Sequence, residues 1–291
     1  MKSIKDCFTL NNGMKIPCMG FGTYRGTDVN CDVKKMVLDA IEVGHRYFDT
    51  ASLYGTEVAL GQAIKESGIP REEFFIVTKL WTDEMGYENT KKACAESLEK
   101  LQMDYLDLYL IHWPKSDEED TNWKAIDIET WKALEDLVDE GKTKGIGLSN
   151  FLPHHIENLK DIWRIKPVVN QLEIHPGYSQ EAAITYCQAN DIQVQAWSPL
   201  GRSRILEDPY MLQLAEKYQV SVSQICLKFI LQKGVIPLPK SANPERMKIN
   251  CDLFSFEISS EDMWQLATMP QTLWLGQHPD FSIPKKARLM K

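Results

Sequence analysis

Short apolar runs alternate along the chain with longer segments in which apolar residues recur every three or four positions. The short runs predict buried strands, and the longer segments predict helices with one buried face. Eight strand-like runs lie at residues 19–22, 46–49, 74–79, 106–111, 144–148, 168–172, 192–197 and 235–239. Three of the helical segments end at Gly44, Gly141 and Gly234, and glycine is a common stop for a helix. The pattern therefore predicts eight repeats of a strand followed by a helix.

Repeated strand–helix units favour a parallel sheet, because consecutive parallel strands need a crossover connection. Eight units predict an α/β fold, a closed (β/α)8 TIM barrel, formed as a single domain over residues 1–291. Residues 1–18 hold an Asn-Gly pair between two short apolar runs, which predicts an N-terminal β-hairpin across the barrel bottom. Residues 270–291 are irregular but rich in large apolar groups, so we expect a C-terminal loop packed over the barrel mouth or side.

The composition narrows the class of protein only slightly. The chain has 291 residues, of which 43% are hydrophobic and 25% charged, as in ordinary globular proteins. Its formal net charge of −8 argues against general binding to nucleic acid or to an anionic membrane, although it allows a local basic pocket. No uninterrupted apolar stretch approaches the roughly 20 residues of a membrane helix.

The seven cysteines are scattered, odd in number and without a C-x-x-C pair. This distribution favours reduced thiols over disulfides or a metal site. No apolar run follows the first residues, so no secretory signal is visible. We therefore expect a cytoplasmic protein that holds no metal.

Four residues near the ends of predicted strands carry the candidate chemistry: Asp49, Tyr54, Lys79 and His112. In a barrel of parallel strands, the residues at the C-terminal strand ends share one mouth. An acid, a phenol, an amine and an imidazole gathered there indicate proton transfer through a tuned tyrosine.

These residue types suit the reduction of a carbonyl group. A carbonyl oxygen that accepts a hydride develops negative charge and needs a proton, which Tyr54 can donate. A nearby ammonium lowers the pKa of a phenol, and Lys79 can supply that charge while Asp49 keeps it in place. His112 can hydrogen-bond the substrate oxygen. Deprotonated Tyr54 would serve as the base in the reverse oxidation.

The motifs around these residues resemble those of the aldo-keto reductase family over nearly the whole chain. The segment from Gly44 to Gly55 resembles the family's first signature, and Asp49 and Tyr54 fall on catalytic positions in it. The other matching segments are the lysine motif at 78–81, the histidine motif at 110–114 and the fifth-strand signature at 145–151. One departure is Thr56, where the family often has asparagine, and we expect little effect on the chemistry.

The resemblance implies a set of cofactor contacts. Gly22 and Thr23 would lie under the nicotinamide, Ser149, Asn150 and Gln171 would hold its carboxamide, and Trp197 would stack on its ring. The pyrophosphate loop would follow Trp197. The complete predicted set is Gly22, Thr23, Asp49, Ser149, Asn150, Gln171, Trp197, Ser198, Leu200, Gly201, Lys240, Ser241, Asn243, Arg246 and Asn250.

The choice between the two nicotinamide cofactors rests on residues 236–246. A lysine, a hydroxyl and an arginine, Lys240, Ser241 and Arg246, lie within seven residues beside a helix start and can surround a phosphate. In the resembling family this segment holds the 2′-phosphate of the adenosine. We therefore predict NADPH/NADP+ as the cofactor in preference to NADH.

The predicted substrate site is aromatic. By resemblance, Tyr24, Trp81 and Trp113 wall a pocket beside Tyr54 and His112, with Trp274 and Leu275 of the C-terminal loop as weaker candidates. Such a pocket suits aldehydes and ketones that carry an apolar or flat part. The partner expected is a small carbonyl compound, and the protein is expected to be a monomer. No arginine adjoins the four motif residues to demand a carboxylated substrate. Two interpretations stay open for Arg25 and Arg202: contacts to such a substrate or, as favoured here, solvated loop charges.

The function predicted is NAD(P)H-dependent reduction of aldehydes or ketones to alcohols, by hydride transfer from nicotinamide C4 with Tyr54 as proton donor. An alternative from another class is a cofactor-sensing regulatory or binding protein on the same barrel, since a fold does not fix a function. A metal-dependent hydrolase is disfavoured, because of the six histidines only His112 and His175 lie near predicted strand ends.

Overall fold

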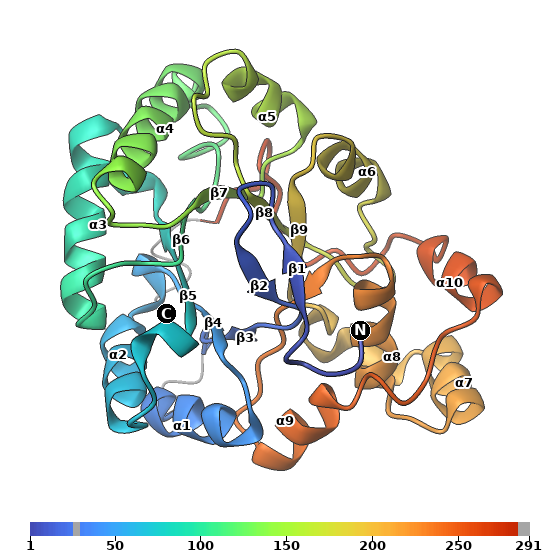
Figure 1. The fold of residues 1–291 in the computed structure, drawn as a ribbon. Helices are drawn as coiled ribbons and strands as arrows, with labels where there is room; N and C mark the ends of the chain where they lie inside the picture. The colour runs from blue at the N-terminus through green and yellow to red at the C-terminus, as the bar shows by residue number, and fades with distance from the viewer. Residues whose placement is uncertain (26–29, 285–291) are drawn as a thin grey trace.

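Eight parallel strands form the centre of the molecule in the computed structural model, which describes residues 1–25 and 30–284 (Figure 1). Neighbours in the sheet follow the order of the chain from β3 to β10. The strands are β3 Phe21–Gly22, β4 Tyr47–Asp49, β5 Phe75–Leu80, β6 Leu108–Ile111, β7 Ile146–Ser149, β8 Val169–Glu173, β9 Gln193–Trp197 and β10 Ile236–Pro237. Each of the eight predicted runs overlaps one of them, with β5, β7 and β8 each ending one residue beyond the predicted run, so the predicted strand order is confirmed.

The sheet closes on itself through the backbone. The Gly20 N–H donates to the carbonyl of Pro237 at 3.1 Å, and the Gly22 N–H donates to that of Pro239 at 3.0 Å. These bonds join the first strand of the sheet to the last. Closure brings all eight C-terminal strand ends to one mouth, as a (β/α)8 barrel requires.

The predicted hairpin consists of β1 Cys7–Thr9 and β2 Lys15–Pro17, which pair antiparallel. Leu10 and Ile16 are buried with side chains from the beginnings of the barrel strands, including Phe75 and Val168. The hairpin therefore covers the N-terminal end of the barrel, opposite the mouth, and lies in front of the sheet in Figure 1.

Helices surround the sheet (Figure 1). They are α1 Val33–Val43, α2 Glu57–Glu66, α3 Tyr87–Leu101, α4 Trp123–Asp139, α5 Pro153–Lys160, α6 Glu181–Ala189, α7 Pro209–Tyr218, α8 Val222–Gln232, α9 Pro244–Cys251 and α10 Ser260–Ala267. The three predicted glycine stops lie at or just beyond the ends of α1, α4 and α8. Gly44, Gly141 and Gly234 all have positive φ angles there, which glycine adopts without a Cβ clash.

The C-terminal segment 270–284 returns to the mouth side of the barrel. The Leu275 N–H donates to the buried carboxylate of Glu173, the last residue of β8, at 3.0 Å, and the Ile283 N–H donates to Glu118 at 3.3 Å. Gln277 and Pro284 line the main cavity. The predicted loop over the barrel thus holds for this part, while residues 285–291 lie outside the described residues.

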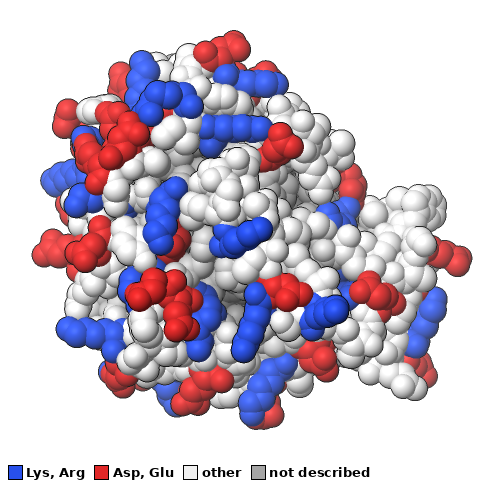
Figure 2. Space-filling model, viewed as in Figure 1, with Lys and Arg blue, Asp and Glu red and all other residues white. Residues whose placement is uncertain are grey.

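The surface around the hairpin carries both signs of charge. Figure 2 shows Lys and Arg side chains interspersed with Asp and Glu on this face, without a broad basic area. Of the helices in the described part of the chain, none combines the length and apolarity needed to cross a bilayer.

Gly61 of α2 is a sensitive point of helix packing. A Cβ atom there would lie 2.2 Å from the carbonyl oxygen of Leu101, at the end of α3. Glycine to alanine in a helix ordinarily stabilises, but here the backbone contact should reverse the sign. We expect Gly61→Ala to lower the free energy of unfolding by about 1–3 kcal/mol in denaturant titrations. Gly22→Ala is the control, because its Cβ would meet its nearest neighbour at an ordinary 3.5 Å. Equal stability of the two variants would contradict the packing argument.

Candidate active site

The main cavity opens at the C-terminal ends of the strands and has a volume of about 430 Å³. Three of the four predicted catalytic residues line it. Asp49 ends β4, Tyr54 ends the short 3-10 helix η1 Ser52–Tyr54 that follows, and His112 comes directly after β6. The fourth, Lys79, lies near the end of β5 and is fully buried behind Tyr54. The barrel therefore brings together the four residues that the sequence singles out.

Lys79 uses all three ammonium hydrogens. Its Nζ donates to Asp49 Oδ1 at 2.6 Å, to the backbone oxygen of Thr50 at 3.0 Å and to the hydroxyl of Tyr54 at 3.4 Å. Burial alone would lower the pKa of Lys79, but Asp49 and Tyr54 outweigh burial and raise it. The lysine is therefore held as an ammonium.

Tyr54 differs from the sequence expectation in one respect. Burial raises the pKa of Tyr54 above its ordinary value, and the Lys79 charge opposes this rise without reversing it. The prediction of a lowered phenol pKa considered the ammonium alone, whereas the phenol also loses its hydration. In the free protein, Tyr54 consequently keeps its proton at neutral pH.

His112 is held as a neutral imidazole. Its Nε2 lies 3.4 Å from the Tyr54 hydroxyl, and its ring packs edge-on against Trp81 with 5.1 Å between ring centroids. Burial, assisted by the positive charge of Lys79, lowers the pKa of His112 well below its ordinary value. A neutral imidazole can donate a hydrogen bond from one nitrogen to a substrate oxygen near Tyr54.

Polar residues from the next strands continue this wall of the cavity. Gln171 of β8 donates to Asp49 Oδ2 at 2.8 Å, so that both carboxylate oxygens of Asp49 are engaged. Asn150 accepts the indole N–H of Trp197 at 2.8 Å, and Asn150 and Ser149 are themselves hydrogen-bonded. The catalytic and carboxamide-binding residues predicted from the sequence thus form one connected network.

The structure separates the predicted cofactor residues into two groups. Those that line the cavity are Gly22, Asp49, Ser149, Asn150, Gln171, Trp197, Ser198, Leu200 and Lys240. Those that do not are Thr23, Gly201, Ser241, Asn243, Arg246 and Asn250. Asn243, Arg246 and Asn250 belong to the start and body of α9, beyond the cavity's edge at Lys240. They could contact only the far end of an extended ligand.

Thr23 has a structural connection that the sequence does not reveal. Its hydroxyl lies 3.1 Å from the backbone oxygen of Asp49 and 3.0 Å from the hydroxyl of Thr56, which lies 2.9 Å from that of Thr50. Thr56 is the position that departs from the family pattern. Its buried hydroxyl therefore helps to tie together the loops that carry Asp49 and Tyr54.

All predicted substrate-site residues, Tyr24, Tyr54, Trp81, His112 and Trp113, line the cavity. Trp81, Trp113 and Leu53 form a small apolar cluster beside Tyr54. From the C-terminal loop, the lining residues are Gln277 and Pro284 and not the expected Trp274 and Leu275.

Several lining residues escaped sequence reasoning. Arg25 and Arg202, read as solvated charges, also line the cavity. Leu53, Pro199, Ser203, Leu238 and Pro239 complete the wall. Most of these residues lie next to a motif, so adjacency to the motifs was a signal that could have found them.

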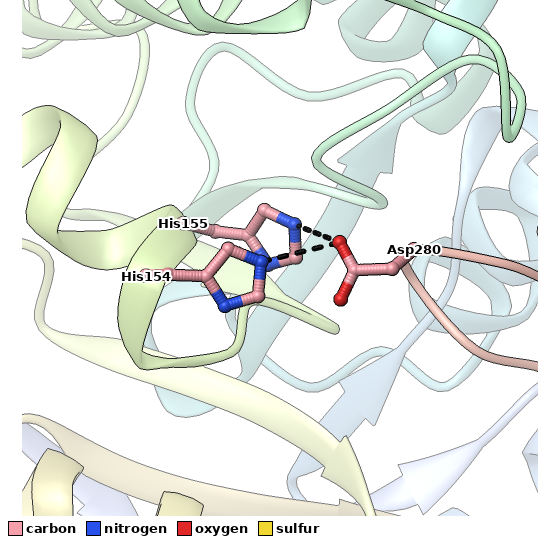
Figure 3. A group of neighbouring side chains, drawn as sticks. All are labelled: His154, His155 and Asp280. Carbon is pink, nitrogen blue, oxygen red and sulfur yellow. Dashed lines mark hydrogen bonds and ion pairs between the residues drawn. The ribbon is translucent and has the colours of Figure 1, made fainter.

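A second polar group lies outside this cavity, where the C-terminal loop meets α5. Asp280 Oδ1 lies 3.1 Å from His154 Nε2 and 3.0 Å from His155 Nε2 (Figure 3). Within residues 1–25 and 30–284 this is the one group of three potential metal ligands close enough to share an ion.

The hydrogen bonds of His155 argue against a metal there. His155 Nδ1 accepts the backbone N–H of Leu152 at 3.1 Å, so the proton of the neutral ring lies on Nε2. A metal would need the Nε2 lone pair. The group is therefore better described as a clamp in which Asp280 accepts hydrogen bonds and fixes the loop to α5.

Comparison with known proteins shows which family the chain belongs to. A family model described as "Aldo/keto reductase family" matches residues 18–269. The chain is 44% identical over 278 residues to a glyoxal reductase of Bacillus subtilis (strain 168), covering 96% of this chain and 98% of that protein.

Solved structures agree with this match. MGS-M4, an aldo-keto reductase from a Medee basin deep-sea metagenome library, has a TM-score of 0.87 at 38% identity, over 94% of this chain and 98% of that one. A Bombyx mori aldo-keto reductase in complex with NADP has a TM-score of 0.86 at 35% identity, over 97% of this chain and 99% of that one.

The family match and the similar solved structures place the chain among the oxidoreductases that share this barrel. Within that class the chain belongs to the aldo/keto reductase family.

His112 should stay neutral across the physiological range. Because burial and Lys79 both disfavour the imidazolium, its NMR chemical shifts should not change between about pH 8 and pH 5. The unfolded chain does take up this proton below about pH 6.5, so His112 should also weaken the fold on acidification. The His112 signal is assigned as the imidazole resonance that is absent from the spectrum of the His112→Gln variant. A titration midpoint near the ordinary value of 6.5 would contradict this account.

Proposed function

We propose that the protein is an NADPH-dependent reductase that converts aldehydes or ketones to alcohols. The observation that carries this proposal is the hydrogen-bonded series Asp49–Lys79–Tyr54 beside a neutral His112, at the inner end of an aromatic cavity. A proton donor and a second hydrogen-bond donor then face the same point, where a substrate oxygen can lie.

The residues of the cavity fit a nicotinamide cofactor. Trp197 offers an aromatic face, and the side chains of Ser149, Asn150 and Gln171 stand beside it. Among the described residues, neither Lys240 at the edge of the cavity nor Arg246 of α9 pairs with a carboxylate. Support also comes from the Bombyx mori relative solved with NADP. When bound, the cofactor supplies the hydride.

The chain's own residues handle the proton. Tyr54 holds it at neutral pH, because burial raises the pKa of its hydroxyl. Release of that proton leaves a phenolate beside the Lys79 ammonium, which stabilises the new charge. Asp49 keeps the ammonium charged, and the His112 imidazole orients the substrate oxygen through a hydrogen bond. In this scheme His112 neither gains nor loses a proton near neutral pH.

The substrates we propose are small carbonyl compounds with a flat or apolar part. Tyr24 packs on Tyr54 with ring centroids 4.9 Å apart, and Trp81 and Trp113 are almost fully buried, so the inner end is narrow and apolar. A relative 44% identical is named for glyoxal reduction. Glyoxal and other short dicarbonyls therefore belong first in a substrate panel.

Binding and turnover together test this function. NADPH should quench the protein's tryptophan fluorescence on titration, and its absorbance at 340 nm should fall when glyoxal or an aromatic aldehyde is added. Binding without turnover on any carbonyl would support a cofactor-sensing role instead. The absence of binding by either NADPH or NADH would overturn the proposal.

Tyr54→Phe tests the proton donor. We expect the rate of reduction to fall on the order of 100-fold or more while NADPH binding is kept, because only the general acid is lost. Tyr178→Phe is a matched control, since Tyr178 does not line the main cavity. Turnover close to that of the unsubstituted protein in Tyr54→Phe would exclude the assigned role.

The double variant Lys240→Ala/Arg246→Ala tests the preference for a phosphorylated cofactor. The two cations would face the 2′-phosphate, so the KM for NADPH should rise on the order of 10-fold while the KM for NADH changes little. Lys248→Ala provides the control, because Lys248 lies on the same helix α9 and pairs with Glu245. Equal effects on both cofactors would contradict the assignment.

A further inference from the structure

Two glutamine side chains face each other inside the barrel. One of them lines the cavity, and the other lies behind it. Gln171 of β8 and Gln195 of β9 are direct partners in the parallel ladder, and both are almost completely buried. Gln171 lines the cavity, whereas Gln195 does not. Sequence reasoning singled out Gln171 but gave no role to Gln195.

The amide of Gln171 has both hydrogens committed inside the protein. Its Nε2 donates to Asp49 Oδ2 at 2.8 Å and to Gln195 Oε1 at 3.0 Å. An amide nitrogen carries two hydrogens, so none remains for a ligand. The oxygen Oε1 is then the one polar atom of this side chain left to face the cavity.

Turning the amide of Gln171 over would be costly. Its oxygen would then lie against the Asp49 carboxylate and the Gln195 oxygen, which are both acceptors in a buried setting. Burial raises the pKa of Tyr47, and Gln195 opposes this rise, but neither the Tyr47 hydroxyl nor Gln195 Nε2 is hydrogen-bonded among the described residues. Asp49 and Gln195 together therefore fix which atom of Gln171 is presented.

The neighbouring polar side chains, Asn150 and Ser149, also direct their hydrogen-bond donors into the protein. Asn150 donates both amide hydrogens inward, to the backbone oxygen of His112 and to Ser149 Oγ. The Ser149 hydroxyl donates to the backbone oxygen of Gln171. What these side chains can still offer to a ligand is acceptor capacity. A ligand group that carries N–H donors, as a carboxamide does, fits such a surface.

We infer that Gln195 is a positioning residue, which by accepting one N–H of Gln171 keeps the Gln171 oxygen turned to the cavity to receive the NH2 of the nicotinamide carboxamide. This inference rests on the proposed function, because it assumes that nicotinamide binds there. Gln195 touches neither the cavity nor the reacting atoms, and it acts through Gln171.

Cofactor analogues separate this role from general packing. In the 3-acetylpyridine analogue of NADP+ a methyl group replaces the carboxamide NH2, while the thionicotinamide analogue keeps the NH2. Dissociation constants are measured by quenching of tryptophan fluorescence. The unsubstituted protein should bind NADP+ roughly 3- to 10-fold more tightly than the acetylpyridine analogue, as for one or two neutral hydrogen bonds. It should bind the thionicotinamide analogue about as tightly as NADP+.

Gln195→Met removes the acceptor and keeps the length of the side chain. The preference for NADP+ over the acetylpyridine analogue should then fall to about twofold or less. Gln195→Glu should keep the preference, because a buried glutamic acid near Asp49 stays protonated and its carbonyl oxygen still accepts. Gln193→Met on the same strand is the control. Gln193 donates to the backbone oxygen of Gly234, outside the cavity, and its loss should leave the preference unchanged.

The outcomes are distinct. A folded Gln195→Met protein with an unchanged preference would overturn the inference, even if its melting temperature fell. If that variant does not fold, Gln171→Met must abolish the preference, and an unchanged preference there would overturn the inference as well. Failure of the unsubstituted protein to bind NADP+ or either analogue would instead refute the proposed function, before any variant is compared.

Discussion

A fully buried ammonium imposes the main constraint on this barrel. Lys79 lies on the inside of the sheet without access to water, and such a charge is tolerated only when it is paired and hydrogen-bonded. Its three acceptors come from Asp49, Thr50 and Tyr54. The end of β4 and the loop behind it must therefore lie at one fixed place relative to β5. Removing one partner from such a pair typically costs about 3–5 kcal/mol.

The same charge sets the electrostatics of its neighbours, in competition with burial. Lys79 favours ionised Tyr54 and neutral His112. For His112 burial acts in the same direction, so the imidazole is firmly neutral. For Tyr54 burial acts in the opposite direction and prevails, so the phenol retains its proton. A donor that stays protonated next to a ready counter-charge suits reduction, because stabilisation appears only as the proton leaves.

Local sequence patterns contain much of this arrangement, but not all of it. The eight strands and the three glycine stops follow from periodicity, and Asp49, Lys79 and His112 follow from their places at strand ends. The acceptor polarity of the cavity wall does not follow. Gln195 reads in the sequence as one more residue of a buried strand, and its bond to Gln171 appears only when β8 and β9 are in register. Thr56 and Asp280 likewise gain their partners from segments distant in the chain, Thr23 and His155 of α5.

The C-terminal loop can change in sequence while this constraint is kept. The loop reaches the cavity through Gln277 and Pro284, and the family match ends before it, at residue 269. Its anchors are Glu173, Glu118 and the His154–His155 pair that holds Asp280. None of these anchors bonds to Lys79 or to Asp49. Changes in the loop can therefore reshape the outer cavity without disturbing the buried charge, whereas a change at Asp49 or Gln171 must alter the surroundings of Lys79 and the polar wall of the cavity together.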